Sequence, residues 1–562
     1  MADIAASRGA KLFTPKLADV LREGYGGAQL RADAMAGLTV AIVALPLSMA
    51  IAIASGVSPD RGLYTAIVGG FLVSALGGSR FQIGGPAGAF IVLIAATVHQ
   101  HGVEGLVLAT FLSGLMIATV GALRLGAFIQ YIPYPVTVGF TAGIAVIILA
   151  SQIKDLLGLR LAGPEPGPLP AKLGALAQAL PTASLPAVLV AGGVIATILA
   201  VRRWRPHWPG MLIAVTLAAA GAALLDLSVE TIATRFGGIP RGLPLPGLPE
   251  ITLTKVQAVL PAALSFTLLG SIESLLSAVV ADSMTGRRHR SNMELVAQGA
   301  ANVGASMFGG IPVTGTIART ATNVRSGSAG PISGILHSLY LLVFMIVAAP
   351  LAGYIPLAAL AGVLAVVAWT MAEKQEFAGL LRASRGDAAV LLLTFFLTIF
   401  RDLTTGIVAG FSVGALLFLH RLATAVEVGR AASQGRDEDD GYDAALTHDP
   451  DVALIRISGA FFFGAAAAVG TALDEIGEQP KAYVLDLTDA PILDSTAAAA
   501  VANFARRAKG RGAFVYLAGA RKAVVRTLLA NGVRPPLARF KAEVAQAVIS
   551  ARRSIAEGRL VA

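Results

Sequence analysis

The pattern of apolar and polar positions divides the chain into a long apolar region and a shorter, more polar tail. Apolar runs begin at Ala34 and end near Val426, and most are long enough for membrane-spanning helices, which need about 20 residues. We identify fourteen candidate spans, seven in each half, at 34–56, 62–77, 88–98, 103–123, 132–152, 184–201, 208–226, 257–282, 292–309, 317–329, 331–350, 355–372, 386–401 and 404–425. The pattern therefore predicts a polytopic α-helical membrane protein.

The two halves carry matching features, which indicates an internal duplication. Glycine/proline breaks at 84–88 and 309–315 recur at nearly the same offset as the tripeptide Tyr-Ile-Pro, which occurs at 131–133 and again at 354–356. An odd number of spans in each half would place the halves in opposite orientations across the membrane. The sequence thus predicts an inverted repeat of seven plus seven segments.

The segments after the two breaks, 88–98 and 317–329, are too short to cross a bilayer alone. Short, interrupted spans at matching places in two halves are typical of a transporter binding site. We interpret each as a half-helix whose N-terminus lies near the membrane midplane and offers unpaired N–H groups to an anion. The alternative is that glycine and proline only mark loops. The predicted substrate-binding residues are Pro46, Ser48, Ala87, Gly88, Ala89, Phe90, Gly315, Thr316, Ile317, Ala318 and Arg319.

The tail reads as a small soluble α/β domain. Strands are predicted at Val452–Ile457, Ala482–Leu487 and Ala513–Ala518, with helices at Ser495–Ala508 and Lys522–Ala530. We divide the whole chain into a cytosolic segment 1–33, a first transmembrane repeat 34–226, an external linker 227–256, a second repeat 257–426, an acidic linker 427–450 and the tail domain 451–562.

Composition agrees with a membrane protein. Of the 562 residues, 55% are hydrophobic and 14% are charged, whereas soluble proteins carry about 25% charged residues. The net charge of +10 is explained by basic residues on cytoplasmic faces of spans rather than by nucleic-acid binding. This places both termini in the cytoplasm. The start of the chain shows no removable signal peptide, and the absence of cysteine excludes disulfides.

Two ionisable residues stand out within the apolar segments. Glu273 is the single ionisable residue between Leu260 and Ala281, and intramembrane carboxylates usually mark an ion or proton path. Ser277 lies one helical turn further and could hydrogen-bond it or complete a cation site; a purely structural carboxylate is the alternative. Arg319 either provides positive charge near the anion, forms a structural salt bridge or extends to the membrane surface.

Several motifs resemble those of the sulfate permease anion transporters (the SulP, or solute carrier 26, family), and the resemblance covers almost the whole chain from Asp33. These motifs are Ala36-Gly37-Leu38-Thr39-Val40, Gly62-Leu63-Tyr64-Thr65, Gly85-Pro86-Ala87, Glu273-Ser274-Leu275-Leu276, Asn292-Met293-Glu294-Leu295, Gly309-Gly310-Ile311-Pro312 and Arg319-Thr320-Ala321-Thr322-Asn323. In the tail, Val484-Leu485-Asp486-Leu487 and Asp494-Ser495-Thr496 are similar to a STAS domain.

The resemblance implies core and gate domains that work by an elevator motion, and a homodimer with cytosolic STAS domains. It also implies that Glu273 couples transport to protons, because family members with aspartate there bind sodium and others with glutamate are proton-coupled. Related soluble STAS proteins are phosphorylated at a serine equivalent to Ser495, whereas helix capping by Asp494 or Ser495 is the simpler interpretation. Many members carry glutamine after the first-span proline; here Leu47 follows Pro46, which leaves the substrate open.

We therefore predict a secondary active anion transporter of the cell inner membrane, a proton symporter of sulfate or a C4-dicarboxylate. Alternatives are a sodium-coupled bicarbonate symporter, an uncoupled anion channel or exchanger, and a membrane-anchored anion sensor. The expected partners are the anion, the coupling proton or sodium ion, membrane lipid, a second copy and a cytosolic protein bound to the STAS domain. No motif for ATP binding, a catalytic metal, a cofactor or enzyme catalysis occurs in the sequence.

Overall fold

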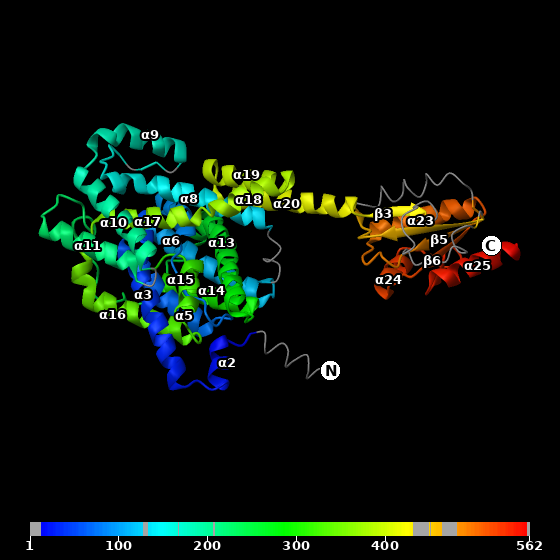
Figure 1. Cartoon of the computed structure of the whole chain (residues 1–562), viewed down its shortest axis with the longest axis horizontal. Coiled ribbons are helices and arrows are strands. Elements are labelled where there is room, and N and C mark those ends of the chain that lie inside the picture. Colours follow the sequence, from blue (N-terminus) through cyan, green and yellow to red (C-terminus); the bar gives the residue numbers. More distant parts are fainter. Residues whose placement is uncertain are drawn as a thin grey trace. The chain divides into compact units, whose positions relative to one another are not determined.

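The computed structural model describes residues 13–126, 133–163, 165–166, 168–205, 208–430, 449, 451–463 and 480–558. Residues 131–132 of the first Tyr-Ile-Pro and the acidic run of the predicted linker lie outside these ranges. The contacts divide the chain into two compact units, Met1–Phe411 and Ser412–Ala562 (Figure 1). The first is helical and the second is built on a β-sheet.

Helices occupy all fourteen segments in which spans are predicted. They are α3 (Gly27–Ala54), α4 (Pro59–Tyr64), η1 (Thr65–Gly69), α5 (Gly70–Leu76), η2 (Gly88–Phe90), α6 (Ile91–Ala122), α8 (Tyr134–Leu157), α10 (Leu185–Trp204), α11 (Gly210–Leu224), α13 (Leu253–Thr285), α14 (Ser291–Met307), α15 (Ile317–Arg325), α16 (Ile332–Ala352), α17 (Leu357–Met371), α19 (Arg385–Phe400) and α20 (Leu403–Thr424). Within the described residues, eight helical stretches are long and apolar enough to cross a membrane. The count of fourteen spans stays a prediction.

In the described part of the first unit, four further helices lie in segments where no helix is predicted. They are α2 (Lys16–Arg22), α9 (Leu169–Ala179), α12 (Ile232–Phe236) and α18 (Lys374–Ala383), with a short turn η3 (Leu180–Thr182). Helix α3 also begins within the predicted N-terminal segment 1–33. Hydropathy identifies apolar spans, but it carries little information on short amphipathic helices. Such helices are stabilised mainly by packing against the rest of the protein.

A glycine separates the first half-helix from the next span. Gly102 interrupts α6 with non-helical backbone angles, φ 67° and ψ −176°, which residues with a Cβ rarely adopt. Residues 88–101 and 103–122 are therefore two helical pieces joined at a kink. This agrees with the predicted division between segments 88–98 and 103–123.

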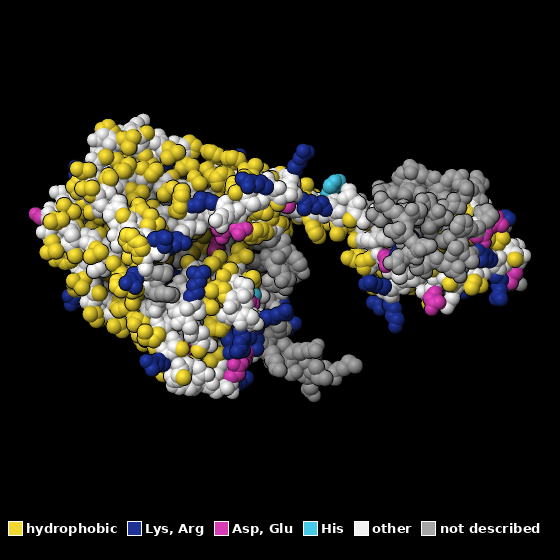
Figure 2. Space-filling view, viewed as in Figure 1, with side chains coloured by type: hydrophobic (Ala, Val, Ile, Leu, Met, Phe, Trp, Pro, Cys, Tyr) yellow, Lys and Arg dark blue, Asp and Glu magenta, His cyan; other side chains and the backbone are white. Residues whose placement is uncertain are grey.

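The helices of the first unit form two bundles. In the first bundle, α6 packs on α13 and α14, while α3 packs on α15 and α16. In the second bundle, α8 packs on α17 and α19, and α10 packs on α11 and α17. Helix α3 contacts α11 and α17, so it joins the two bundles. Hydrophobic side chains cover most of the visible face of this unit (Figure 2), as a lipid-facing surface requires.

Two very short strands bring the glycine/proline breaks together. Strand β1 (Gly84–Gly85) pairs antiparallel with β2 (Thr314–Gly315), with Gly84 opposite Gly315 and Gly85 opposite Thr314. The breaks are more than two hundred residues apart in the sequence. Their pairing places the starts of η2 and α15 side by side inside the first bundle.

The second unit contains a five-stranded sheet in the order β3-β4-β5-β6-β7. Its elements are β3 (Glu427–Arg430), β4 (Val452–Ser458), β5 (Ala482–Asp486), α23 (Ser495–Gly510), β6 (Phe514–Ala518), α24 (Lys522–Ala530), β7 (Arg539–Lys541) and α25 (Val544–Ala556). Strands β4 to β7 are parallel and β3 is antiparallel to β4. Helices α23 and α24 cover one face and α25 covers the other.

The alternating pattern predicts the three central strands and two of these helices correctly. Strands β3 and β7 and helix α25 are not predicted. Strand β3 is formed by the first four residues of the segment 427–450, which is predicted as a linker. Edge strands have weak apolar patterns, since only part of their surface is covered.

Candidate functional site

The N-terminus of half-helix α15 lacks the side-chain cap that usually satisfies a helix start. Its N-cap residue is Thr316, whose hydroxyl donates instead to the carbonyl of Ile83, 3.2 Å away. The Thr316 N–H donates to the same carbonyl at 3.0 Å. Within the described residues, the N–H groups of Ile317 and Ala318 therefore have no acceptor. Such N–H groups favour an anion, together with the positive end of the helix dipole.

The turn that starts the other half-helix is also uncapped. Ala87 is the N-cap residue of η2, and it has no side chain that could accept a hydrogen bond from the first turn. Its carbonyl accepts from the N–H of Phe90 at 3.1 Å, while Gly88 and Ala89 have N–H groups without an acceptor in the described chain. Because β1 and β2 pair, these N–H groups and those of Ile317 and Ala318 belong to neighbouring turns.

Arg319 is a fully buried cation in this region. Its side chain is 1% exposed, and Nη2 donates to Ser48 Oγ at 3.0 Å and to the Pro86 carbonyl at 3.4 Å. Its Nε and Nη1 have no partner, and no carboxylate of the described chain forms an ion pair with it. The burial argues against a side chain extended to the membrane surface, and the missing carboxylate argues against a structural salt bridge. A buried charge without a counter-charge is costly, so Arg319 creates a strong preference for an anion.

Glycines give Arg319 and the strand pair the room that they need. A Cβ added to Gly85 would collide with Nη1 of Arg319, and one added to Gly315 would collide with the amide of Gln82. Both contacts would be far shorter than real Cβ contacts. Glycine is required at Gly85 and Gly315 because neighbouring side chains approach the backbone too closely for a Cβ.

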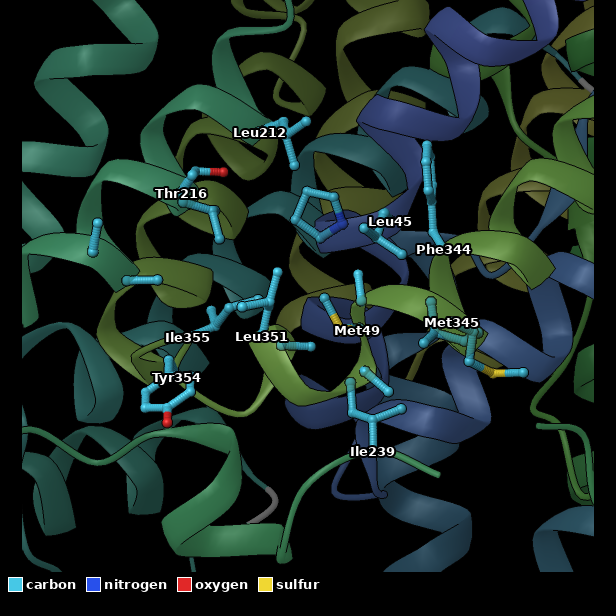
Figure 3. A pocket seen from close by; sticks show the side chains of 18 of the residues that line it. Leu45, Met49, Leu212, Thr216, Ile239, Phe344, Met345, Leu351, Tyr354 and Ile355 are labelled. Carbon is cyan, nitrogen blue, oxygen red and sulfur yellow. The ribbon is translucent and has the colours of Figure 1, made fainter. Parts of the chain in front are cut away.

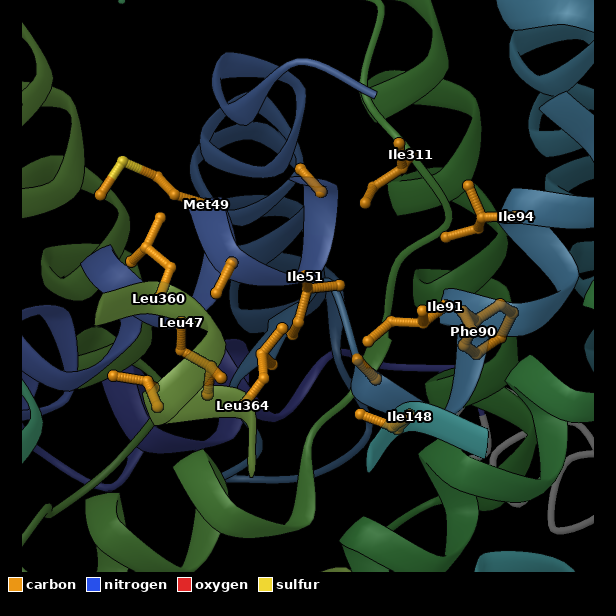
Figure 4. Packing of buried hydrophobic residues seen from close by; sticks show 14 of the residues in the cluster. Leu47, Met49, Ile51, Phe90, Ile91, Ile94, Ile148, Ile311, Leu360 and Leu364 are labelled. Carbon is orange, nitrogen blue, oxygen red and sulfur yellow. The ribbon is translucent and has the colours of Figure 1, made fainter. Parts of the chain in front are cut away.

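The first span contributes through Ser48, which joins α3 to α15. Its hydroxyl accepts from Arg319 and donates to the carbonyl of Ala44 at 2.7 Å. The adjacent Leu47 points elsewhere: it belongs to a buried cluster with Leu360 and Leu364 of α17 (Figure 4). The position where many family members carry glutamine is thus part of an apolar contact between the two bundles.

The remaining predicted residues differ in exposure. Ala87, Ala89, Phe90 and Thr316 are buried, Gly88 and Ile317 are partly exposed, and Ala318 is exposed. A Cβ at Gly88 would lie 3.4 Å from Met371 of α17 and 3.5 Å from Ile148 of α8. The start of η2 in the first bundle therefore faces the second bundle.

Glu273 lies close to the paired breaks but makes no bond to them. It is 8% exposed, and no described residue hydrogen-bonds or ion-pairs with its carboxylate. Ser274 on the same helix instead bonds Thr314 Oγ1 at 3.0 Å and accepts from the Gly315 N–H at 3.2 Å. These contacts therefore do not support the alternative that Glu273 is a structural carboxylate bonded to one of the breaks. The Glu273 carboxylate thus has no hydrogen-bond or ion-pair partner within the described chain.

Ser277 does not bind Glu273, contrary to one of its predicted roles. Its hydroxyl donates to Thr320 Oγ1 at 3.0 Å, and Thr320 accepts in turn from the Ile83 N–H at 3.1 Å. These bonds connect α13, α15 and the segment before β1. Ser277 thus holds the two breaks in position.

Asn302 fixes the backbone just before β2. Its amide accepts from the Val313 N–H and donates to the Val313 carbonyl, both at 2.9 Å. Thr65 supports the same segment, since its hydroxyl accepts from the Ile311 N–H at 2.7 Å. Asn302 therefore positions the loop that leads into β2.

We expect Asn302→Ala to destabilise the protein by about 2–4 kcal/mol, because two buried backbone groups of Val313 lose their partners. Thermal unfolding of the purified full-length protein measures this. The matched control is Ser306→Ala, one turn further on α14, whose hydroxyl bonds only the local Val303 carbonyl. Equal melting temperatures for the two variants would contradict the role of Asn302.

Two further buried polar residues of this region are missed by the sequence analysis. His337 of α16 and Gln82 before β1 are buried, and no described residue hydrogen-bonds their side-chain nitrogen or oxygen atoms. His337 is an ionisable residue within an apolar span, which is a recognised sign of function.

Among the predicted substrate residues, Pro46 lies at a cavity. It lines an apolar cavity of about 400 Å³ beside α11 and α16. A polar cavity of about 660 Å³ lies near Asp60, Glu104 and Lys255, and its lining includes none of the predicted substrate residues.

In the tail domain, Asp494 is the N-cap of α23. Its carboxylate accepts from the Ala497 N–H at 2.8 Å and from the Phe463 N–H at 3.0 Å. Ser495 is the first helical residue and is exposed. This geometry agrees with the simpler interpretation, that Asp494 caps the helix. Ser495 remains accessible to solvent. No group of His, Cys, Asp or Glu suited to a metal occurs among the residues described.

Comparison with known proteins agrees with this architecture. The Sulfate permease family matches residues 30–394 and the STAS domain matches residues 443–547. The putative sulfate transporter YvdB of Bacillus subtilis (strain 168) is 38% identical over 88% of this chain and 93% of its own length. The bicarbonate transporter BicA of Synechocystis sp. is 32% identical over 87% of this chain and 88% of its own length.

The fold also matches the murine Slc26a9 anion transporter in its inward-facing state, with a TM-score of 0.84 at 17% identity, over 96% of this chain and 94% of that one. The architecture is thus that of a multi-pass membrane transporter with a STAS domain, and not of an enzyme. The chain belongs to the sulfate permease family of anion transporters.

Proposed function

We propose that this chain is a secondary active transporter that carries a small anion together with protons across the cell inner membrane. The observation that carries the proposal is the buried guanidinium of Arg319, which has no carboxylate partner in the described chain and lies beside two uncapped helix starts. Positive potential from all three sources converges on one small region. The predicted substrate residues other than Arg319 and Ser48 would contribute mainly backbone groups and space.

Transport would proceed by an elevator motion in which the first bundle slides along the second. The half-helix starts belong to the first bundle, and Gly88 at the start of η2 faces Met371 and Ile148 of the second. Leucine side chains such as Leu47 and Leu364 form the contact between the bundles. Apolar contacts of this kind have no directional bonds, so a sliding motion does not break hydrogen bonds.

Coupling to protons would depend on Glu273. Its carboxylate is nearly buried and unpaired, so carrying a charge there is unfavourable unless a proton or cation is bound. Ser277 is committed to Thr320, which weakens the case for a cation site built from both side chains. We therefore favour protons over sodium.

The substrate would be sulfate or a C4-dicarboxylate, both of which suit a pocket formed by backbone N–H groups and one guanidinium. YvdB, the similar protein from Bacillus subtilis, is described as a putative sulfate transporter. Sodium-coupled bicarbonate transport is the second candidate, because BicA is described as a bicarbonate transporter.

Uptake of radiolabelled anions into proteoliposomes tests these alternatives. We expect sulfate, succinate or fumarate to accumulate under an inward proton gradient. Accumulation of bicarbonate driven by sodium alone would favour the second candidate. Equal uptake with and without any cation gradient would instead indicate a channel or an exchanger.

The tail domain would regulate transport and take part in homodimer formation, with both termini and the STAS domain in the cytoplasm. Ser495 is exposed at the start of α23, where a phosphate would lie at the positive end of the helix. We propose it as a phosphorylation site that alters binding of a cytosolic partner.

A further inference from the structure

The apolar cavity of about 400 Å³ lies between the two bundles. Helix α3 and the second half of α16 line one side, and α11 lines the other. Figure 3 shows Leu45 and Met49 of α3 near the middle of the view, with Thr216 of α11 and Tyr354 to their left. The cavity is within the size range of sites that hold small organic ligands.

The chemistry of the lining is almost wholly apolar. Of the nineteen lining residues, only Thr216 and Tyr354 have a polar side chain. Such a cavity offers too few hydrogen bonds to hold ordered water or an anion. Any occupant must therefore be apolar where it contacts the walls.

The cavity opens to the outer surface of the helical unit. At its mouth, Leu351 is 69% exposed and Tyr354 is 60% exposed. The adjacent Val347 and Leu217, which lie outside the lining, are also exposed apolar residues of α16 and α11. Exposed apolar residues on spanning helices face lipid. Tyrosine at a helix end is typical of the membrane interface.

We propose that this cavity is a binding site for an acyl chain of a membrane phospholipid, which enters between α11 and α16. The acyl chain would lie against Pro46. Pro46 is two residues before Ser48, whose hydroxyl accepts a hydrogen bond from Arg319. A second copy of this protein is a poorer occupant, because the site is a recess lined by residues as deeply buried as Met49 and Met345. A lipid chain is thin enough to reach these residues.

A bound chain would also affect transport, and this consequence rests on the proposed elevator motion. The cavity lies between the two bundles, so its shape changes when they slide. An acyl chain that fills it stabilises the arrangement described here, in proportion to the apolar area that it covers. Lipids whose acyl chains enter the cavity would therefore slow the sliding of the first bundle along the second.

Photo-crosslinking of the full-length protein in vesicles tests the site. A phosphatidylethanolamine with a diazirine in its acyl chain is included in the vesicles, and labelled peptides are identified by mass spectrometry. We expect labels on the lining residues of α11 and α16. Ala349→Phe and Ala220→Phe, which fill the cavity from opposite walls, should reduce these labels about ten-fold, because the chain loses its buried apolar contacts.

Val347→Phe is the matched control, since it places the same ring on the same helix but faces away from the cavity, where Val347 is 72% exposed. It should leave the labels unchanged. Equal labelling of all variants would overturn the site, and so would crosslinks to a second copy in place of lipid. Labelling does not depend on transport, so its failure is distinguishable from failure of the proposed function.

Discussion

Replacing Arg319 with glutamine is expected to weaken binding of the transported anion by about 10- to 100-fold, the range of a lost hydrogen bond to a charged group. The reason is the position of the guanidinium, which is buried beside two uncapped helix starts and keeps Nε and Nη1 free of partners in the described chain. Glutamine keeps a polar side chain but removes the charge. Isothermal titration with sulfate and with succinate measures the loss.

The control for this experiment is Arg325→Gln on the same helix. Arg325 is exposed in the last turn of α15, so its replacement removes the same charge far from the helix start. Its anion affinity should match that of the parent protein. If Arg319→Gln binds anions normally while its melting temperature falls, Arg319 is a structural crosslink between α3 and α15 and the proposed site is wrong.

Replacing Glu273 with glutamine is expected to abolish proton-driven accumulation while anion exchange continues. Glutamine has nearly the same shape but cannot exchange a proton, and Glu273 has no hydrogen bond within the described chain whose loss would disturb the fold. One pH unit is worth about 1.4 kcal/mol, so coupling to one proton raises accumulation about ten-fold per unit. The variant should lose this factor.

Uptake into proteoliposomes at several imposed pH gradients, with counterflow exchange measured in parallel, checks the expectation. Glu104→Gln serves as the control, because Glu104 is also a carboxylate of the first bundle but its side chain is 88% exposed. Accumulation by Glu273→Gln that still follows the pH gradient would show that another group carries the proton. Loss of exchange as well would indicate a structural role.

His337 shows why part of the site escapes sequence analysis. Its position in an apolar span is visible in the sequence, but only the fold reveals that both ring nitrogens are buried without a partner. Ser277 illustrates the reverse case. Its helical spacing from Glu273 suggests a bond, yet the neighbouring α15 offers Thr320 as a closer partner. Spacing along one helix carries no information on what the next helix presents.

The sequence by itself determined the apolar helical segments, the two breaks and the central strands of the tail domain. These depend on local properties, since apolar runs partition into lipid and glycine and proline interrupt helices wherever they occur. Tertiary structure alone decided that β1 pairs with β2, that Ser48 receives Arg319, that Leu47 packs among leucines and that an apolar cavity lies behind Pro46. Each of these contacts joins segments distant in the chain, and packing among many side chains selects such contacts together.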